Sequence, residues 1–456
     1  MSETYAAHRA PRNSAPAEQL VSILSKSIID LQGAFLRDGL EGYEPGDIYH
    51  TPLGRLAKRL WRTGTALSFL VAAPLQVIDL VFPQIRYVIA KKRKHPLCYA
   101  QFGLACLALR ETPLKESADY LQLARRCADD LMAIAVRTKS GIGWGINLHW
   151  ENLGGYIPPN TPCHTQTSYV FAFLDRLLQC GIGDAGKRTL LEIAEHTLRD
   201  YHEFVDDKTG EWVTGYSTLD KRPVVNSISY RACILLRAGE LFRNPEYLRK
   251  GLSSVRYVLK SQNADGSWDY SRDAHFVDGY HTCFVLKNLM FSMDVLSRTS
   301  SSEYGSVVKE ISSAVRAGYG YYARALLDEV GVPIPFSVRN KPLIYAYDSY
   351  DLAEGIGVLS RFDEPLRLNK ILSFLTKRMR TKGGFYKFRY YPYLSRILEG
   401  MTYPRHANTP LFLAMAEALH RIAGNGVEDL NISEGSTGSP ARIRGTSERA
   451  EASAGF

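Results

Sequence analysis

Apolar residues recur along this chain at the three- and four-residue spacing of amphipathic helices, in segments that come in pairs. Five pairs are predicted, and one further helix follows them. The predicted pairs cover 96–111 with 116–137, 163–180 with 186–205, 223–242 with 246–262, 280–297 with 303–327 and 346–360 with 364–381, and the last helix covers 407–422. Two helices in each unit of roughly 50–60 residues indicate an array of helical hairpins.

Glycine followed by a large aromatic ring marks the turn that ends several of these pairs. The clearest case is Gln262-Asn-Ala-Asp-Gly-Ser-Trp268, and the other aromatic markers are Trp144, Trp212 and Phe385. Glycine gives the turn backbone freedom, and the ring supplies an apolar plug. A single hairpin cannot bury its own apolar face, so neighbouring hairpins must stack. The pattern predicts an all-α fold, an (α/α) toroid or barrel of about six helical hairpins with an N-terminal helical extension.

The predicted toroid domain covers residues 95–423. Residues 17–94 are expected to form a separate N-terminal helical segment that begins with an amphipathic helix over 17–36. The apolar face of this helix consists of Val21, Leu24, Ile28, Leu31 and Phe35. Residues 1–16 and 424–456 contain few bulky apolar side chains, so both are expected to be disordered tails.

The N-terminal segment also contains an apolar run over 65–82. Its length approaches that of a membrane span, but Pro74, Gln76 and Asp79 argue against a transmembrane helix. Basic residues flank the run on both sides, namely Lys58, Arg59 and Arg62 before it and Arg86, Lys91, Lys92, Arg93 and Lys94 after it. Two interpretations are open. The helix packs on the toroid with its charges in solvent, or it lies on an anionic inner-membrane surface.

Composition narrows the choice of partners. The 56 Lys and Arg residues outnumber the 47 Asp and Glu residues, which gives a net charge of +9 and suits an acidic partner. No nucleic-acid partner is expected, because no zinc finger, RNP motif or dense basic stripe is present. The seven cysteines lie mostly in apolar helical runs, and residues 1–16 lack the apolar stretch of a signal peptide. The expected location is therefore the cytoplasm, with the inner membrane surface as the peripheral alternative.

Two resemblances follow from these motifs. The Gln262 to Trp268 turn resembles the repeat of squalene-cyclase and prenyltransferase-like toroids, where it is structural, so it implies a fold and no activity. The chain over roughly 95–422 also resembles bacterial proteins found with exopolysaccharide and O-antigen genes. The motifs that carry this second resemblance are Gly143 to Trp150, Pro158 to Ser168, Val224 to Asn226, Gln262 to Tyr270, Val277 to Thr282 and Tyr403 to His406. It implies work on a polysaccharide or a lipid-linked glycan. Asn147 and His149 depart from the group, where many relatives are more apolar or acidic.

Several reaction types are open. Terpenoid chemistry would need clustered Asp residues for diphosphate-bound Mg²⁺, and only Asp129-Asp130 is present. No Cys/His cluster has zinc spacing, so neither a metal nor a cofactor is expected. Hydrolysis of a glycosidic bond needs two carboxylates, for which Glu151 and Asp278 are candidates. Epimerisation or β-elimination on a uronate needs a base and a cation, for which His281 and Arg405 are candidates. A non-catalytic glycan-binding assembly factor is the remaining alternative.

The candidate site residues lie in the connections between helices, which a toroid brings together at one mouth. We expect Glu151, Asp278 and His281 to act as acid or base groups, although Asp278 is equally suited to cap the helix that follows it. The expected substrate-binding residues are Trp144, Asn147, His149, Trp150, His164, Asn226, Trp268, Tyr280, Tyr347, Asp348 and Arg405. Aromatic rings among them would stack on sugars, and Arg405 would anchor an acidic sugar. His406, next to Arg405, belongs to the same set of possible proton-transfer groups.

Overall fold

The computed structural model describes residues 15–61, 66–152, 155–181, 184–299, 304–337, 346–394, 398 and 400–423. The chain divides into two units, Met1–Asn425 and Gly426–Phe456, and the described residues all belong to the first. The predicted disordered tails therefore lie outside the described residues, except for the first two residues of helix α1.

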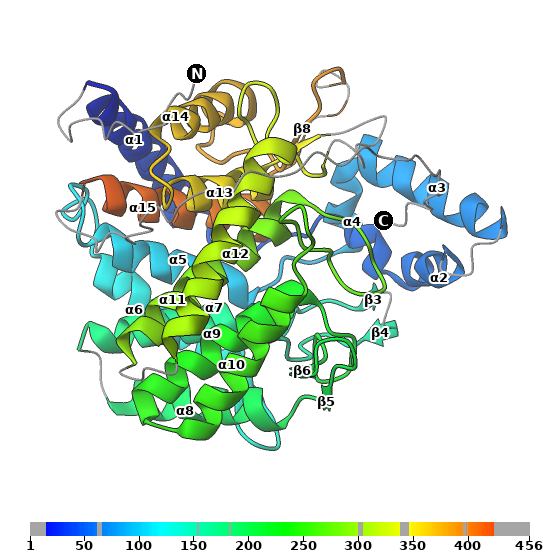
Figure 1. Cartoon of the computed structure of the whole chain (residues 1–456). Helices are drawn as coiled ribbons and strands as arrows, with labels where there is room; N and C mark the ends of the chain where they lie inside the picture. Colours follow the sequence, from blue (N-terminus) through cyan, green and yellow to red (C-terminus); the bar gives the residue numbers. More distant parts are fainter. Residues whose placement is uncertain are drawn as a thin grey trace, which may run out of the picture. The chain divides into compact units, whose positions relative to one another are not determined.

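Within the described residues, an inner ring of six helices closes on itself, because each helix packs against the next and the last packs against the first (Figure 1). These inner helices are α5 (Pro96–Leu109), α7 (His164–Gln179), α9 (Val225–Phe242), α11 (Gly279–Arg298), α13 (Ser349–Leu359) and α15 (Thr409–Ala423). The outer helices are α6 (Tyr120–Ala133), α8 (Asp184–Arg199), α10 (Pro245–Lys260), α12 (Tyr304–Ala325), α14 (Pro365–Phe374) and α1 (Ala15–Asp38). This arrangement confirms the predicted all-α toroid of six hairpins.

Helix α1 belongs to the ring, although the sequence suggested a separate N-terminal segment over 17–94. It packs against α15 and α14, and Leu24, Ile28 and Leu31 are buried in the main core. Phe35 meets the ring of Phe412 from α15 edge-on, with 5.8 Å between centroids. Among the described residues no helix follows α15, and α1 takes the place of its outer partner. The sixth hairpin is therefore built from the two ends of the described chain.

The burial of α1 gives a matched pair of substitutions at adjacent positions. Ile28 is fully buried, whereas Ile29 is 50% exposed. We expect Ile28→Val to lower the free energy of unfolding by about 0.5–1.5 kcal/mol, because one buried methyl group is lost and a small cavity is left. Ile29→Val should change it by less than about 0.5 kcal/mol. Chemical denaturation measures both, and equal effects would place α1 outside the core.

The connections from outer to inner helices gather at the N-terminal ends of the inner helices. Backbone bridges join the residue just before an inner helix to the connection that leads into the next inner helix, from Cys163 to Ser217, from Val224 to Ser271 and from Asp278 to Phe336. The same connections hold four two-stranded antiparallel sheets. These are β1 (Val136–Arg137) with β2 (Ile142–Gly143), β3 (Trp150–Asn152) with β4 (Gly155–Ile157), β5 (Glu203–Val205) with β6 (Trp212–Thr214), and β7 (Tyr347–Asp348) with β8 (Arg389–Tyr390). The predicted mouth of the toroid is this end.

Two of the aromatic turn residues act as the predicted plugs. Trp144 and Trp268 are buried, and each indole N–H donates a hydrogen bond to a carbonyl of the preceding outer helix, Leu131 at 2.8 Å and Val258 at 2.9 Å. Trp212 differs, because it is 41% exposed and its ring lies under the ammonium group of Lys250. The turn motif thus fixes where a hairpin ends, but not how deeply its ring is buried.

The segment between α1 and α5 lies at one side of the ring (Figure 1). It consists of η1 (Asp47–His50), α2 (Pro52–Trp61), α3 (Ala66–Val81), η2 (Pro83–Ile85) and α4 (Arg86–Ile89). Ile48, Ala57 and Leu75 form a small core of its own. Two π-helical turns, η4 (Leu375–Met379) and η5 (Pro404–Asn408), complete the described elements, and η5 leads directly into α15.

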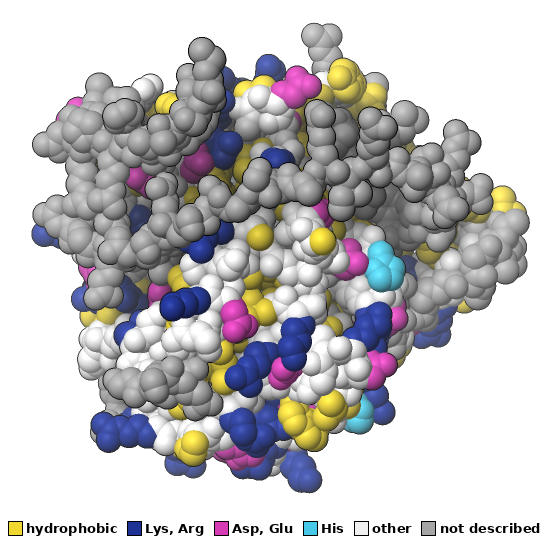
Figure 2. All heavy atoms as spheres, viewed as in Figure 1, with side chains coloured by type: hydrophobic (Ala, Val, Ile, Leu, Met, Phe, Trp, Pro, Cys, Tyr) yellow, Lys and Arg dark blue, Asp and Glu magenta, His cyan; other side chains and the backbone are white. Residues whose placement is uncertain are grey.

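Charges of both signs are mixed on the outer ring. Figure 2 shows Lys, Arg, Asp and Glu side chains interspersed over the region of α8 and α10. Ion pairs made by these two helices include Arg199 with Glu195 at 2.5 Å and Lys260 with Glu211 at 2.7 Å.

Candidate active site

A histidine–carboxylate pair lies at the N-terminal end of α11. Asp278 caps the helix, because its Oδ1 accepts the backbone N–H of His281 at 3.0 Å. Its other carboxylate oxygen, Oδ2, lies 2.6 Å from His281 Nδ1. A carboxylate only accepts hydrogen bonds, so Nδ1 donates a proton to it, and Nε2 is the ring nitrogen that Asp278 does not engage. Asp278 thus caps the helix and also orients the His281 ring.

This pair borders a small hollow at the mouth of the toroid. The hollow is lined by Val225, Asn226, Trp268, Asp269, Tyr270, Phe276, Asp278, His281, Thr282 and Val285. The side-chain oxygen of Asn226 is buried there and has no hydrogen-bond partner among the described residues. A buried amide oxygen without a partner is costly, so this atom is well placed to accept a hydrogen bond from a ligand hydroxyl.

A second small hollow lies beside the first. It is lined by Ile146, Leu148, Trp150, Ile157, Thr161, Cys163, Tyr216 and Ser217. Trp150 and Tyr216 meet edge-to-face with 5.6 Å between centroids, and Tyr270 of the first hollow packs against the same apolar cluster. The aromatic rings around the two hollows offer apolar faces on which a sugar ring can stack.

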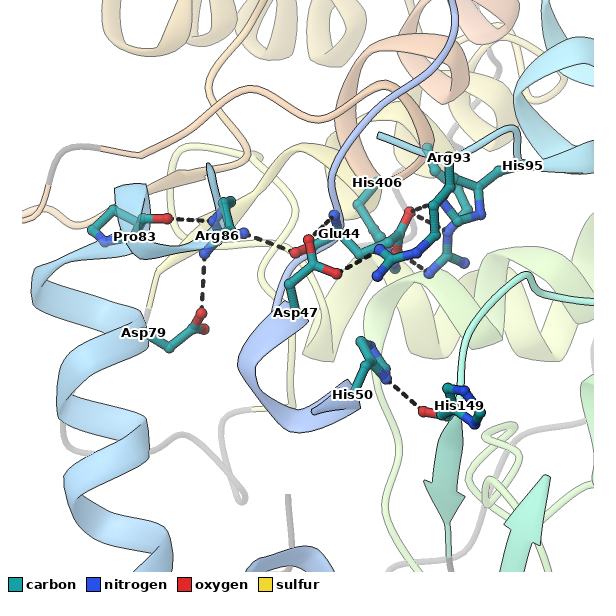
Figure 3. A network of polar contacts seen from close by, with 11 residues as sticks. Glu44, Asp47, His50, Asp79, Pro83, Arg86, Arg93, His95, His149 and His406 are labelled. Atoms are coloured by element: carbon teal, nitrogen blue, oxygen red, sulfur yellow. Dashed lines mark hydrogen bonds and ion pairs between the residues drawn. The ribbon is translucent and has the colours of Figure 1, made fainter. Parts of the chain in front are cut away.

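A second carboxylate cluster centres on Glu44, from the loop after α1 (Figure 3). Glu44 is fully buried and makes a two-point ion pair with Arg405, with its Oε1 accepting from Arg405 Nε at 2.8 Å. His406 Nε2 lies 3.0 Å from Glu44 Oε2, and His95 Nε2 lies 3.1 Å from Glu44 Oε1. Three segments therefore meet at the Glu44 carboxylate: the loop after α1, the residue before α5, and the π-helical turn η5.

The charges in this cluster set the protonation of its members. Burial alone would raise the pKa of Glu44, but Arg405, His95 and His406 together hold it well below its usual value. Burial lowers the pKa of His95 to about 4. The pKa of His406 is lowered as well, mainly by burial and to a smaller extent by the positive charge of Arg405. At neutral pH, Glu44 is therefore ionised and His406 is neutral, with its ring 30% exposed.

Aromatic rings connect the two histidines. Tyr280 lies 4.2 Å from the His281 ring and 5.4 Å from the Tyr350 ring, and Tyr350 lies 6.0 Å from the ring of His406. Burial, and to a smaller extent the negative charges of Asp278 and Asp351, raise the pKa of Tyr280 well above its usual value. The Tyr280 side chain is therefore a neutral phenol. The rings of Tyr280 and Tyr350 thus form a continuous aromatic row between His281 and His406, two residues of the type that transfers protons in catalysis.

Two more carboxyl groups lie at the start of α13. Asp348 caps this helix, accepting the backbone N–H of Tyr350 at 2.8 Å, and pairs with Arg389 at 3.2 Å. Asp351 is buried against Gly279, and no side chain among the described residues pairs with its carboxyl group. Burial, with the nearby charges of Asp348 and Asp278, raises its pKa well above the usual value. Asp351 therefore holds its proton to higher pH in the folded chain than in the unfolded chain.

Asp351→Asn should show this in the pH dependence of stability. Because the folded-state pKa is raised, the stability of the native chain falls as pH rises from the unfolded value toward the folded value. Asparagine does not titrate, so the variant should be more stable than the native chain by about 1–3 kcal/mol at pH 8, with the difference vanishing toward pH 4. Urea denaturation at both pH values measures this. The exposed Asp129→Asn serves as the control, and a difference independent of pH would contradict the assignment.

The structure brings only some of the expected site residues together. The first hollow is lined by Asn226, Trp268, Asp278 and His281, and the second hollow is lined by Trp150. The ring of Tyr280 packs beside the ring of His281. Asn147 is half-buried in the loop before β3. His149 is exposed, with Nδ1 2.6 Å from the hydroxyl of Tyr156.

Other expected residues are engaged within the protein. Trp144 has no exposed surface, so its ring does not line the mouth. His164 is buried against Tyr201 with 3.8 Å between ring centroids, and burial holds its pKa well below the usual value. The Tyr347 hydroxyl donates to Asp328 at 2.7 Å. Trp144 Nε1, His164 Nε2 and the Tyr347 hydroxyl each form a hydrogen bond within the protein, so these side chains serve packing.

The two most important sequence candidates for charge recognition are also paired internally. Glu151 is buried on β3, with Oε1 2.5 Å from Arg59 Nε, and it lines neither hollow. Arg405 faces Glu44, so its charge is already neutralised. The expectations that Glu151 supplies an acid and Arg405 anchors an acidic sugar are therefore not supported by their contacts.

Sequence reasoning missed Glu44, His95 and Asp351. Glu44 lies in a short loop with no motif, and His95 precedes a helix without any neighbouring carboxylate in the sequence. The one available signal was the unusual pair Arg405-His406, whose charge requires a buried acidic partner elsewhere in the chain.

Comparisons with known proteins agree on the fold. No protein-family model and no curated protein matches the sequence. Among solved structures, a sugar epimerase from a ruminal bacterium matches with a TM-score of 0.53 and 11% identity, over 73% of this chain and 89% of that chain. A polysaccharide lyase matches with a TM-score of 0.51 and 10% identity, over 76% and 96%. A glycosyl hydrolase of family 88 from Bacteroides vulgatus matches with a TM-score of 0.50 and 10% identity, over 76% and 97%.

At such low identity, these similarities establish the fold alone. The chain has the six-hairpin α/α toroid seen in carbohydrate-active hydrolases, lyases and epimerases. The expected exopolysaccharide setting stays a prediction. The choice among the reaction types has to come from the chain's own side chains.

Proposed function

We propose that this chain is a glycan-modifying enzyme of the epimerase or isomerase type, which moves a proton on a sugar carbon. The observation that carries the proposal is the presence of two histidine–carboxylate pairs, His281 with Asp278 and His406 with Glu44, at the N-terminal ends of two inner helices. Inversion at a carbon needs one group that removes a proton from one face and another that delivers a proton to the opposite face. Two oriented imidazoles supply both groups.

The proton removed must be acidic, so it must lie next to a carbonyl or carboxyl group. Two sugars meet this condition, the open-chain form of a reducing sugar and a uronate. A uronate needs a free cation at its carboxylate, and Arg405 is neutralised by Glu44. The contacts therefore favour a neutral reducing sugar, held at the end of a short glycan whose next ring occupies the hollow of Trp150 and Tyr216.

Hydrolysis is less well supported. It requires two carboxyl groups facing one glycosidic bond, and the expected partner of Asp278 is buried with Arg59. β-Elimination would use the same first step as epimerisation, but it also needs a uronate. A glycan-binding assembly factor would keep the two hollows and show no reaction.

Incubation in D₂O with a panel of neutral reducing oligosaccharides, uronate oligomers and glycans of the source organism tests the proposal. NMR and mass spectrometry of the sugars are expected to reveal deuterium on one sugar carbon and a second epimer or isomer. New reducing ends without deuterium would identify a hydrolase, an unsaturated sugar would identify a lyase, and binding without conversion would identify the assembly factor. Each of these three results would overturn the proposal.

A further inference from the structure

Helix α3 exposes its apolar face to solvent. Large hydrophobic side chains on α3, η2 and α4 have exposed fractions between 36% and 86%, namely Phe69, Leu70, Val77, Val81, Phe82, Tyr87, Val88 and Ile89. Along α3 the exposed positions follow helical spacing, while Val71, Ala72, Leu75 and Ile78 on the opposite side pack toward η1 and α2. Both faces of the helix are apolar, and the outer face has nothing among the described residues to cover it.

The exposed side chains are concentrated in this segment. Of the 22 large hydrophobic side chains that are exposed among the described residues, ten lie between Leu53 and Ile89. Scattered apolar residues on a surface are ordinary, but a contiguous group of this kind marks a surface that contacts something apolar.

The charge of the same segment indicates what that contact is. Residues 52–94 contain nine Lys and Arg residues and a single acidic residue, Asp79. Four of the nine form ion pairs within the protein, namely Arg59, Arg86, Arg93 and Lys94. Lys91 and Lys92 are exposed directly after Ile89. The outer ring instead mixes both signs (Figure 2). An apolar surface with a basic border matches the interface of an anionic bilayer, where acyl chains lie beneath negative headgroups.

The shape of the segment suits a position within the interface. Among the described helices, none is long and apolar enough to cross a membrane alone. The two stretches Ser68–Val81 and Pro83–Ile89 reach the required length only together, and the chain bends by 94° between them. A bent pair with its apolar side chains on the outer surface can lie in the headgroup region without crossing the bilayer.

We propose that α3, η2 and α4 form a docking surface for an anionic phospholipid bilayer. Phe69, Leu70, Phe82 and Val88 enter the interface, and Lys91 and Lys92 contact the phosphate groups. Helix α2 connects this surface to the active-site mouth, because it packs against β3, the strand that carries Trp150. Docking would place the second hollow beside the membrane, which suits a lipid-linked glycan; this last consequence rests on the proposed function.

Sedimentation with lipid vesicles tests the docking surface without any measurement of activity. The native chain should bind vesicles made of equal parts phosphatidylglycerol and phosphatidylcholine, bind pure phosphatidylcholine more weakly, and lose affinity as salt is added. The double variant Leu70→Glu/Val88→Glu should lower the affinity by at least about tenfold, because each change places a charge in the apolar interface. Lys91→Glu/Lys92→Glu should abolish the preference for phosphatidylglycerol.

The matched control is Leu366→Glu on α14, because Leu366 is 71% exposed and Leu70 is 73% exposed. This control should bind vesicles like the native chain, and all variants should keep the native melting curve. The proposal is overturned if the native chain does not bind anionic vesicles, or if Leu70→Glu/Val88→Glu and Leu366→Glu have equal effects. It is also overturned if the native chain is a dimer that the double variant dissociates while vesicle binding is unchanged, since a second copy would then cover the face.

Discussion

His281→Asn should lower the turnover number for the sugar substrate by about 10²–10⁴-fold, the usual contribution of a general base. Asparagine is smaller than histidine and can still donate an N–H to Asp278, so the cap of α11 should survive. The imidazole of His281 is lost, and no other histidine is among the described residues that line the first hollow. Steady-state kinetics on the substrate found by the D₂O screen measures the loss, and thermal melting verifies the fold.

The control for this variant is His202→Asn. His202 is exposed next to β5 and contacts only the ring of Phe204 among the aromatic side chains described, with 5.8 Å between centroids. Its replacement should change the turnover number by less than about twofold, within the ordinary range for surface changes. If His281→Asn kept native turnover, the assignment of the base would be wrong, whatever reaction the chain catalyses.

Glu44→Ala should lower the free energy of unfolding by about 3–5 kcal/mol at pH 7. Its carboxylate is the shared partner of Arg405, His95 and His406, and removing it leaves the Arg405 guanidinium uncompensated with only 11% of its side chain exposed. The loop after α1 would also detach from η5. Urea denaturation with circular dichroism measures the change.

The pH dependence of this variant has a defined sign. The folded-state pKa of Glu44 is held well below its unfolded value, so its stabilisation is present above the unfolded pKa and is lost as pH falls through the folded pKa. The difference between native chain and variant should therefore shrink at strongly acidic pH. Glu41→Ala, at an exposed position three residues earlier, should cost less than about 0.5 kcal/mol. Similar costs for the two variants would show that Glu44 does not hold the three segments together.

The helices and their closure into a toroid could be predicted because their signals are local. Each amphipathic segment carries its own apolar spacing, and each glycine–aromatic turn marks where a hairpin ends. The position of α1 could not be read in this way. Its apolar stripe shows that one face is buried, but not that the buried face meets α14 and α15 at the far end of the chain. Periodicity gives the face of a helix and leaves its partner open.

In the candidate site, too, local contacts could be predicted from the sequence and long-range contacts could not. Asp278 and His281 are three residues apart at a helix start, and that spacing alone suffices to bring a carboxylate to an imidazole. Glu44 and Arg405 are 361 positions apart, so nothing near Arg405 indicates that its charge is already matched. The pairing of Arg405 and the omission of Glu44 therefore have one cause, a long-range ion pair. The pairing of Glu151 could not be predicted for the same reason, because Arg59 lies 92 positions before it.

The central claim is that two histidines act on opposite faces of one sugar carbon, and isotope exchange by single-histidine variants in D₂O tests it most directly. The native chain should place deuterium on that carbon in both epimers. His281→Asn and His406→Asn should each stop interconversion of the two epimers. In each variant the remaining histidine should still exchange the proton of one epimer, the one whose carbon–hydrogen bond points toward that histidine. The claim would be contradicted if both variants lost exchange and interconversion in parallel for both epimers. It would also be contradicted if the native chain converted the sugar without taking up deuterium.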